Sequence, residues 1–156
     1  MPDLLVNLAK LPPLEPLVTE LEKQSITIRR AQPFEINPLR TFIEHEFSLG
    51  WADEVSVGFA NKPVSVFVAT MDRRIVGFAA YECTRRNFFG PTGVSKALQG
   101  RGVGTALLIA SLNGLHELGY VYGIIGAAGP VDFYKKTVGA VVIADSTPGI
   151  YTDLLR

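Results

Sequence analysis

Alternation of apolar and polar residues predicts a set of strands early in the chain. Residues 26–29 alternate in this way, which is typical of a strand with one buried face. Two apolar runs, 64–69 and 75–81, are separated by Met71-Asp72-Arg73 and predict a hairpin with a short polar turn. Residues 88–94 form another strand, in which Gly90, Pro91 and Gly93 mark a bulge.

Apolar residues at helical spacing predict the helices. Asn37 suits the N-cap and Pro38 the first position of a helix that Gly50-Trp51 ends. A long helix ends at Gly119, and its apolar residues cover so much of its surface that burial on more than one side is expected. The expected helices cover 37–47, 52–59, 103–118 and 130–136, and the last strands cover 120–127, 141–144 and 150–155.

This order of elements predicts an α/β (α+β) fold. Hairpin strands come first and a strand–helix–strand crossover follows, so we expect a mixed, mostly antiparallel sheet with helices on both faces. Residues 25–156 form one domain in this interpretation. Residues 1–24 form an apolar arm containing a helix near Leu14–Leu21, which packs on its own domain or on a partner subunit.

The charge distribution narrows the range of partners. The chain has 156 residues with 15 basic and 15 acidic side chains, and zero net charge argues against nucleic acid or an anionic membrane as a partner. Residues 35–54 nevertheless hold five acids against one arginine, a net of −4. Residues 85–101 hold four bases and no acid, a net of +4. The neutral total therefore conceals an acidic segment and a basic segment, which two solvated faces would also produce.

The residues that a metal site, a serine nucleophile or a membrane span would require are absent from the sequence. Cys83 is the only cysteine, and with His45 and His116 it makes no recognisable metal site, so no metal is expected. No G-x-S-x-G motif is present for a serine nucleophile. The N-terminus has no basic leader, and no apolar stretch is long enough for a membrane span. A cytoplasmic protein is expected, which a single thiol also fits.

A glycine-rich loop carries the clearest chemistry. Gln99-Gly-Arg-Gly-Val-Gly104 stands between a strand and the long helix. The first turn of a helix has unpaired N–H groups and a partial positive charge, and glycines let an anion approach them, so the loop suits a phosphate. It matches neither a P-loop nor a dinucleotide fingerprint. A loop that needs positive φ for structural reasons alone is the alternative.

The loop and a second segment resemble one known family. Gln99-Gly-Arg-Gly-Val-Gly104 resembles the Q/R-x-x-G-x-G/A pyrophosphate-binding motif of the GNAT acetyltransferases, and Phe133-Tyr134-Lys135-Lys136 with Gly139-Ala140 is similar to a later segment of that family. The element order over roughly 25–156 fits as well. The chain departs from the family at Gly126–Pro130, where many members have a cofactor-binding Asn, and in one extra residue between Tyr134 and Gly139.

The resemblance implies a binding site for acetyl-CoA as co-substrate. A backbone N–H near Val94 would stabilise an oxyanion, and Tyr134 would protonate or hydrogen-bond the departing thiolate. The cofactor-binding residues that it implies are Thr92, Gly93, Val94, Gln99, Gly100, Arg101, Gly102, Val103, Gly104 and Thr105.

The general base and the acceptor site remain open at this stage. The strand at 88–94 and its flanks hold no acid, so the first candidate for the base is Glu82. The other candidates are Glu44, Glu46, Asp53 and Glu54, and for each acid a solvated surface residue is the favoured alternative. Phe47, Trp51 and Tyr81 are candidate walls of the acceptor pocket, although core packing would explain them equally well.

Three functions are compatible with these residues. The first is an N-acetyltransferase that moves an acetyl group from acetyl-CoA to a primary amine, with a small molecule favoured and a protein N-terminus or lysine as the alternative. The acidic segment at 35–54 suits a cationic substrate. The second is a non-catalytic CoA-binding sensor or regulatory protein. The third is a general nucleotide-phosphate binder. A homodimer is compatible with the apolar arm and the final strand.

Overall fold

The computed structural model describes residues 1–156, whose strands form one seven-stranded sheet in the order β2-β3-β4-β5-β6-β1-β7. All neighbouring strands are antiparallel except β5 and β6, which are parallel. The mostly antiparallel sheet is therefore confirmed. The strands are β1 (Leu4–Asn7), β2 (Ile26–Arg30), β3 (Val66–Met71), β4 (Arg74–Tyr81), β5 (Phe88–Val94), β6 (Tyr122–Ile125) and β7 (Val141–Val142).

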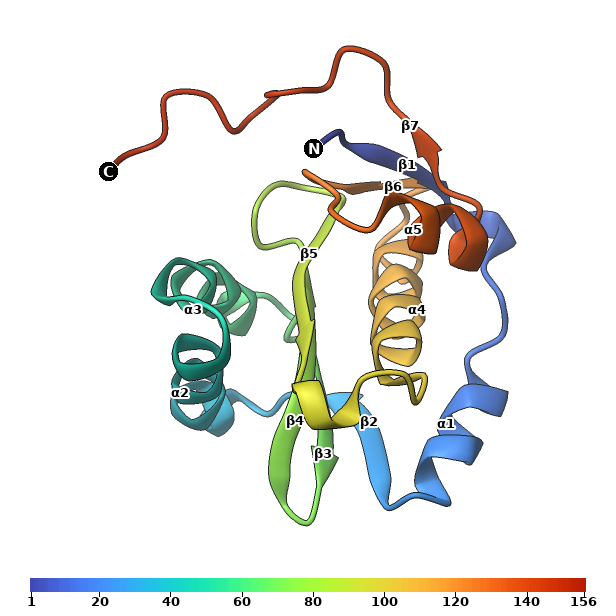
Figure 1. The fold of residues 1–156 in the computed structure, drawn as a ribbon, viewed down its shortest axis with the longest axis vertical. Helices are drawn as coiled ribbons and strands as arrows, with labels where there is room; N and C mark the ends of the chain where they lie inside the picture. The colour runs from blue at the N-terminus through green and yellow to red at the C-terminus, as the bar shows by residue number, and fades with distance from the viewer.

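Helices cover both faces of this sheet, as expected. The helices α2 (Ile36–Glu46) and α3 (Leu49–Ser56) lie on one side, and α1 (Glu15–Glu22) and α4 (Val103–Glu117) lie on the other (Figure 1). The short helix α5 (Val131–Val138) packs near β1. The longest helix, α4, has 15 residues, and no helix combines the length and hydropathy needed to cross a bilayer.

Each face of the sheet has its own hydrophobic core. The larger core surrounds α4, whose residues Leu107, Leu108 and Ile109 are all buried on successive sides of the helix. This confirms that α4 is covered on more than one side. The smaller core joins α2 and α3 to the opposite face through residues such as Ile43 and Phe78.

The predicted hairpin between β3 and β4 is present. Its turn consists of Asp72 and Arg73, which both have positive φ (51° and 62°). Positive φ at both central residues is the conformation whose twist matches that of the two strands. Met71, expected in the turn, instead pairs with Arg74 as the last residue of β3.

The boundary between α2 and α3 differs from the prediction. Gly50 and Trp51 lie inside α3 rather than at the end of the preceding helix. The side chain of Ser48 accepts a hydrogen bond from the Trp51 N–H and starts α3 at Leu49. Serine is a favoured N-cap residue, and its position here explains why the helix boundary lies before Gly50.

The two ends of the chain also differ from the prediction. Residues 4–7 form β1, a strand that lies between β6 and β7 and was not expected. The predicted final strand over 150–155 does not form, because β1 pairs with the two-residue β7 and the chain then continues as an irregular tail (Figure 1).

Candidate functional site

The loop before α4 presents its backbone N–H groups. Gly100 and Gly102 have φ of 80° and 90°, a conformation that side chains disfavour. The amides from Gly100 to Thr105 donate no hydrogen bond within the protein, and the first helical bond of this region runs from the Ala106 N–H to the Gly102 carbonyl. The loop thus combines free donors with the positive end of the longest helix.

The strand β5 opens a gap beside this loop. It pairs with β6 only at Phe88 and Phe89, and its register with β4 shifts between Ala79 and Tyr81. The Ser95 N–H donates to the Val76 carbonyl on β4. Because successive backbone groups point to opposite sides of a strand, the N–H of Val94 points away from β4.

Val94 also links the strand to the loop. The Gln99 side chain donates to the Val94 carbonyl at 3.3 Å. A cavity of about 210 Å³ lies at this junction. Its lining is formed by Val94, Leu98, Gln99, Gly100, Gly102, Gly104, Thr105 and Phe133.

Four of the expected cofactor-binding residues lie outside this cavity. Val103 is a core residue with 1% exposure, so only its backbone faces the loop. Arg101 is exposed. Gly93 underlies the Phe47 ring, where an added Cβ would lie 2.3 Å from a ring carbon. The Thr92 hydroxyl donates to the Phe78 carbonyl at 3.0 Å, and Thr92 lines the next cavity along β5.

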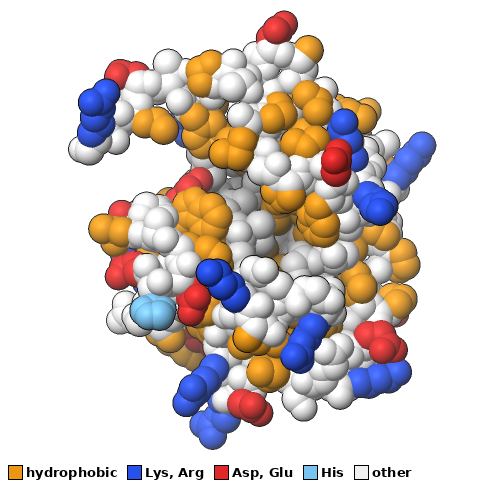
Figure 2. All heavy atoms as spheres, viewed as in Figure 1, with side chains coloured by type: hydrophobic (Ala, Val, Ile, Leu, Met, Phe, Trp, Pro, Cys, Tyr) orange, Lys and Arg blue, Asp and Glu red, His pale blue; other side chains and the backbone are white.

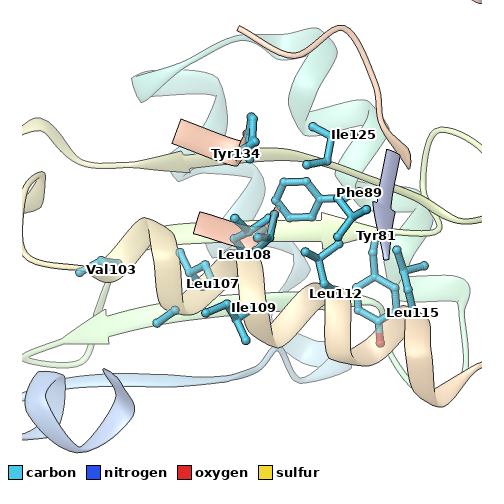
Figure 3. Packing of buried hydrophobic residues seen from close by; sticks show 14 of the residues in the cluster. Tyr81, Phe89, Val103, Leu107, Leu108, Ile109, Leu112, Leu115, Ile125 and Tyr134 are labelled. Carbon is cyan, nitrogen blue, oxygen red and sulfur yellow. The ribbon is translucent and has the colours of Figure 1, made fainter. Parts of the chain in front are cut away.

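Tyr134 lies in this second cavity, which has a volume of about 330 Å³. Its ring packs edge-on against Phe89 with the centroids 6.3 Å apart (Figure 3). Its hydroxyl makes no hydrogen bond within the protein. Burial raises the pKa of Tyr134 to about 12, so the side chain stays neutral and keeps its proton at neutral pH.

Two of the expected acceptor-side aromatics lie together at the other wall. Phe47 and Trp51 stack with their ring centroids 5.5 Å apart, and each is 37% exposed. Trp51 lines the same cavity as Tyr134, so the structure brings these two predicted residues to one site. Phe47 lies beside it, over the bulged strand.

The third aromatic, Tyr81, lies in the core instead. It is 1% exposed and stacks on Phe67. Its hydroxyl accepts a hydrogen bond from the Arg30 guanidinium. The ring lies beside Leu115 at the far end of α4 (Figure 3) and lines none of the cavities described above. Tyr81 is therefore not a wall of the acceptor pocket.

Glu82, the first candidate for a general base, is also engaged elsewhere. Its carboxylate accepts hydrogen bonds from the Asn87 N–H and from the Tyr120 hydroxyl. It closes the turn between β4 and β5 and lines none of these cavities. The structure does not bring Glu82 together with Tyr134.

The acid that does reach the site is Glu54. It lines a third cavity of about 200 Å³ that shares Trp51, Phe89 and Gly126 with the cavity of Tyr134. The hydroxyl of Thr84 donates to its carboxylate. Glu54 follows Trp51 by three residues on α3, so the helical period already places the two on one face.

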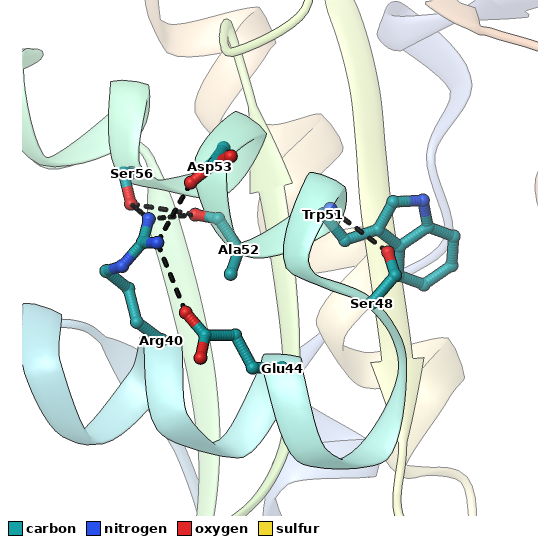
Figure 4. Close-up of polar contacts among 7 residues, drawn as sticks. All are labelled: Arg40, Glu44, Ser48, Trp51, Ala52, Asp53 and Ser56. Atoms are coloured by element: carbon teal, nitrogen blue, oxygen red, sulfur yellow. Dashed lines mark hydrogen bonds and ion pairs between the residues drawn. The ribbon is translucent and has the colours of Figure 1, made fainter. Parts of the chain in front are cut away.

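The other candidate acids belong to different contacts. Glu44 and Asp53 pair with the Arg40 guanidinium at 3.2 and 2.9 Å (Figure 4). Arg40 also donates to the Ala52 carbonyl and the Ser56 hydroxyl, and so joins α2 to α3. Glu46 lies beside His45, 3.5 Å from its ring nitrogen, at the end of α2.

Segments far apart in the sequence complete the site. The Ala127 N–H donates to the Asp3 carboxylate, and the Ala128 N–H donates to the Pro2 carbonyl, so the start of the chain holds the loop after β6. Met1 lines both the cavity of Tyr134 and the cavity of Glu54, and Tyr151 of the tail lines the cavity of Glu54. Figure 2 shows the surface hollowed beneath the tail. No local motif predicts these residues.

Cys83 has no place in this chemistry. Burial raises the pKa of its thiol to about 11, and its sulfur contacts the Tyr81 carbonyl at 3.4 Å. A thiol held neutral in this way is a poor nucleophile.

Comparison with known proteins identifies the fold. No protein-family profile and no curated protein sequence matches the chain. The GCN5-related glucosamine N-acetyltransferase region of a fungal multi-domain GH3 β-N-acetylglucosaminidase superposes with a TM-score of 0.70 at 18% identity, covering 91% of this chain and 19% of that one. A GCN5-related N-acetyltransferase from Sphaerobacter thermophilus superposes with a TM-score of 0.68 at 18% identity, covering 91% and 48%.

A third solved structure has the same general fold. An aminoglycoside acetyltransferase from an uncultured soil metagenomic sample superposes with a TM-score of 0.54 at 20% identity, covering 73% of this chain and 88% of that one. The chain spans less than half the length of the first two structures. At these identities the comparisons define the fold, which is that of the GCN5-related N-acetyltransferases (GNAT), as the loop and the element order predicted.

Proposed function

We propose that this protein transfers an acetyl group from acetyl-CoA to a primary amine of a small molecule. The observation that carries this proposal is the line of cavities along β5. The free amides of Gly100–Thr105 lie at one end, Tyr134 lies in the middle and Glu54 lies at the other end.

The loop is suited to the pyrophosphate of CoA. The unpaired amides of Gly100–Thr105 can each donate to a phosphate oxygen, and the dipole of α4 favours the negative charge. Glycine at positions 100 and 102 leaves the backbone open at positive φ. Neither feature depends on the sequence resemblance, and both fit a phosphorylated co-substrate.

The gap beyond the bulge is suited to the thioester arm. The N–H of Val94 points into it, away from β4, and can donate to the thioester oxygen as negative charge develops there. Thr92 stands two residues earlier on the same side of β5 and lines the cavity of Tyr134. The arm can therefore follow β5 from the loop toward Tyr134.

Tyr134 is the group that we assign to the leaving thiolate. Its hydroxyl has no hydrogen-bond partner in the protein and carries its proton at neutral pH, as any tyrosine with a pKa of 10.0 or above does, and burial raises this pKa further, to about 12. It can donate a hydrogen bond to the sulfur as the C–S bond breaks, which stabilises the departing thiolate. The acceptor amine attacks the thioester directly, so no enzyme nucleophile is needed.

Release of free CoA thiol in the presence of amines tests this function. Wild-type protein should bind acetyl-CoA by calorimetry and release thiol only when an amine is added. If acetyl-CoA does not bind, the proposal is wrong, and tighter binding of ATP would indicate a nucleotide-phosphate binder. If acetyl-CoA binds but a broad amine panel releases no thiol, the protein is a CoA-binding sensor.

A further inference from the structure

The chemistry of the acceptor follows from the charges that line its cavity. In the two joined cavities around Tyr134 and Trp51, Glu54 is the only charged side chain. It is half-buried and takes part in no ion pair. A carboxylate that is partly removed from water without a cationic partner is costly, and a bound cation would offset that cost.

The position of this carboxylate is fixed by its surroundings. The Thr84 hydroxyl donates one hydrogen bond to it and leaves its remaining acceptor capacity free. Trp51 stands one helical turn before Glu54, and its partly exposed ring lines the same cavity. A carboxylate beside an aromatic face is a favourable setting for an ammonium group.

The tail limits the size of the acceptor. The hydroxyl of Tyr151 lies against Gly126, where an added Cβ would be only 2.7 Å away, so the tail closes on the loop after β6. The cavity that remains, about 200 Å³, is also lined by Met1, Phe89 and Pro91. Apart from Glu54 its lining has no charged side chain, so no side chain there would pair with an anionic group on the acceptor; the one cationic group among these residues is the α-amino group of Met1.

From this geometry we infer that Glu54 binds the ammonium group of the acceptor, and that the acceptor is a compact monocationic primary amine without a carboxylate. This inference rests on the proposed function, because only an acetyltransferase needs a site for an acceptor amine. The binding itself does not depend on acetyl-CoA, so it can be tested alone. The bound ammonium group loses one proton to water, and the neutral amine then attacks the thioester.

A matched pair of probes separates the two charge requirements. 2-Phenylethylamine carries an aromatic body and an ammonium group, and L-phenylalanine adds a carboxylate to the same body. Trp51 is the only tryptophan in the chain, so protein fluorescence reports binding at this wall directly. We expect wild-type protein to bind 2-phenylethylamine about 10- to 100-fold more tightly than L-phenylalanine, as for a hydrogen bond to a charged group.

Glu54→Gln tests the residue. The glutamine carbonyl can still accept from Thr84, so only the charge is lost. This variant should weaken 2-phenylethylamine binding about 10- to 100-fold and remove most of the preference over L-phenylalanine. In the transfer assay it should raise KM for the amine with little change in kcat. Asp53→Asn is the control, because Asp53 pairs with Arg40 outside the cavities, and it should leave both measurements unchanged.

The outcomes distinguish this inference from the proposed function. If Glu54→Gln binds the amine as wild type does, if L-phenylalanine binds equally well, or if neither probe changes the fluorescence, the inference is wrong. The calorimetric affinity for acetyl-CoA is measured separately. A protein that binds acetyl-CoA and acetylates some other amine with Glu54→Gln unaffected keeps its function and loses only this acceptor site.

Discussion

The two ends of the site are built in different ways. The loop end uses residues that follow one another, from Thr92 on β5 to Thr105 on α4. The acceptor end combines residues from α3, from the turn after β4, from the loop after β6 and from the tail. Short-range geometry therefore determines the first end, and tertiary packing determines the second.

This difference separates a site that local geometry can form from one that needs distant segments to meet. A phosphate needs only free amides and a helix N-terminus, which a short loop supplies. An acceptor needs a shaped and charged cavity, which Glu54, Thr84 and Tyr151 form only when distant segments meet. Substitutions at one end should therefore leave the other end unaffected, and the predictions below test the two ends separately.

The largest effect is expected from Tyr134→Phe, where the two ends meet. Removing the hydroxyl should lower kcat about 100-fold or more, because the departing thiolate loses its hydrogen-bond donor. Affinity for acetyl-CoA and thermal stability should change little, since this hydroxyl has no partner in the protein. Thiol-release kinetics and calorimetry check both expectations.

Tyr81→Phe is the matched control for this tyrosine. Its hydroxyl accepts from Arg30 in the core, so its loss should lower the free energy of unfolding by about 1 kcal/mol. The value of kcat should stay at that of wild type. A drop in kcat for Tyr81→Phe comparable to that of Tyr134→Phe would contradict the assigned roles.

Gly102→Ala should weaken acetyl-CoA binding about 10- to 100-fold, the equivalent of one hydrogen bond to a charged group. Gly102 has φ of 90° at the N-cap of α4, so alanine moves the amides out of place. Gly119→Ala at the other end of α4, with φ of 100° and open space for a Cβ, has a similar backbone cost without touching the site. Calorimetry should find normal binding for Gly119→Ala; equal losses would mean that general strain explains the effect.

Stability at high pH tests the environment of Tyr134. Its folded pKa of about 12 lies above the ordinary value of 10.0, so the unfolded chain loses this proton first as pH rises. The stabilising contribution is complete below pH 10 and is lost as pH approaches 12. At pH 11, the free energy of unfolding measured in urea should have fallen by about 1 kcal/mol more for wild type than for Tyr134→Phe. Parallel curves for the two proteins would show that the hydroxyl is not buried.

The smallest effect is expected from Arg40→Met, because Arg40 does not line the cavities and acts on the acceptor end only through α3. The substitution removes the hydrogen bonds from Arg40 to Ala52, Asp53 and Ser56, which join α2 to α3 (Figure 4). The face of α3 that carries Trp51 and Glu54 should then be less well positioned, raising KM for the amine a few-fold. Affinity for acetyl-CoA should be unchanged in calorimetry, and a parallel loss of that affinity would show that the two ends are coupled.

The sequence predicted the loop end more fully than the acceptor end, for a physical reason. Gly100, Gly102 and the apolar helix after them are local signals of backbone conformation and burial. Trp51 is a candidate wall from the sequence only as an aromatic residue, which core packing would explain equally well. Tyr81 is an aromatic of the same kind, and only packing tells it apart, since its side of the sheet faces α4.

The acids could not be ranked from the sequence for the same reason. Glu82 follows a strand that leads to the site, but its positive φ of 59° and its hydrogen bond from Asn87 hold it in the turn. Glu54 was one of several candidates, and its three-residue spacing from Trp51 was the one signal that could have raised it. The contributions of Met1 and Tyr151 depend on β1 and the tail, whose positions no local pattern determines.

The position of β1 has a consequence for how the protein folds. Leu4 pairs with Ile125 on one side and with Val142 on the other, so β1 is synthesised long before either of its neighbours. Contacts between such distant residues raise the contact order and slow folding. Until β6 has been synthesised, Leu4 and Val6, which are fully buried in the finished protein, remain in water as an apolar segment that a chaperone can bind.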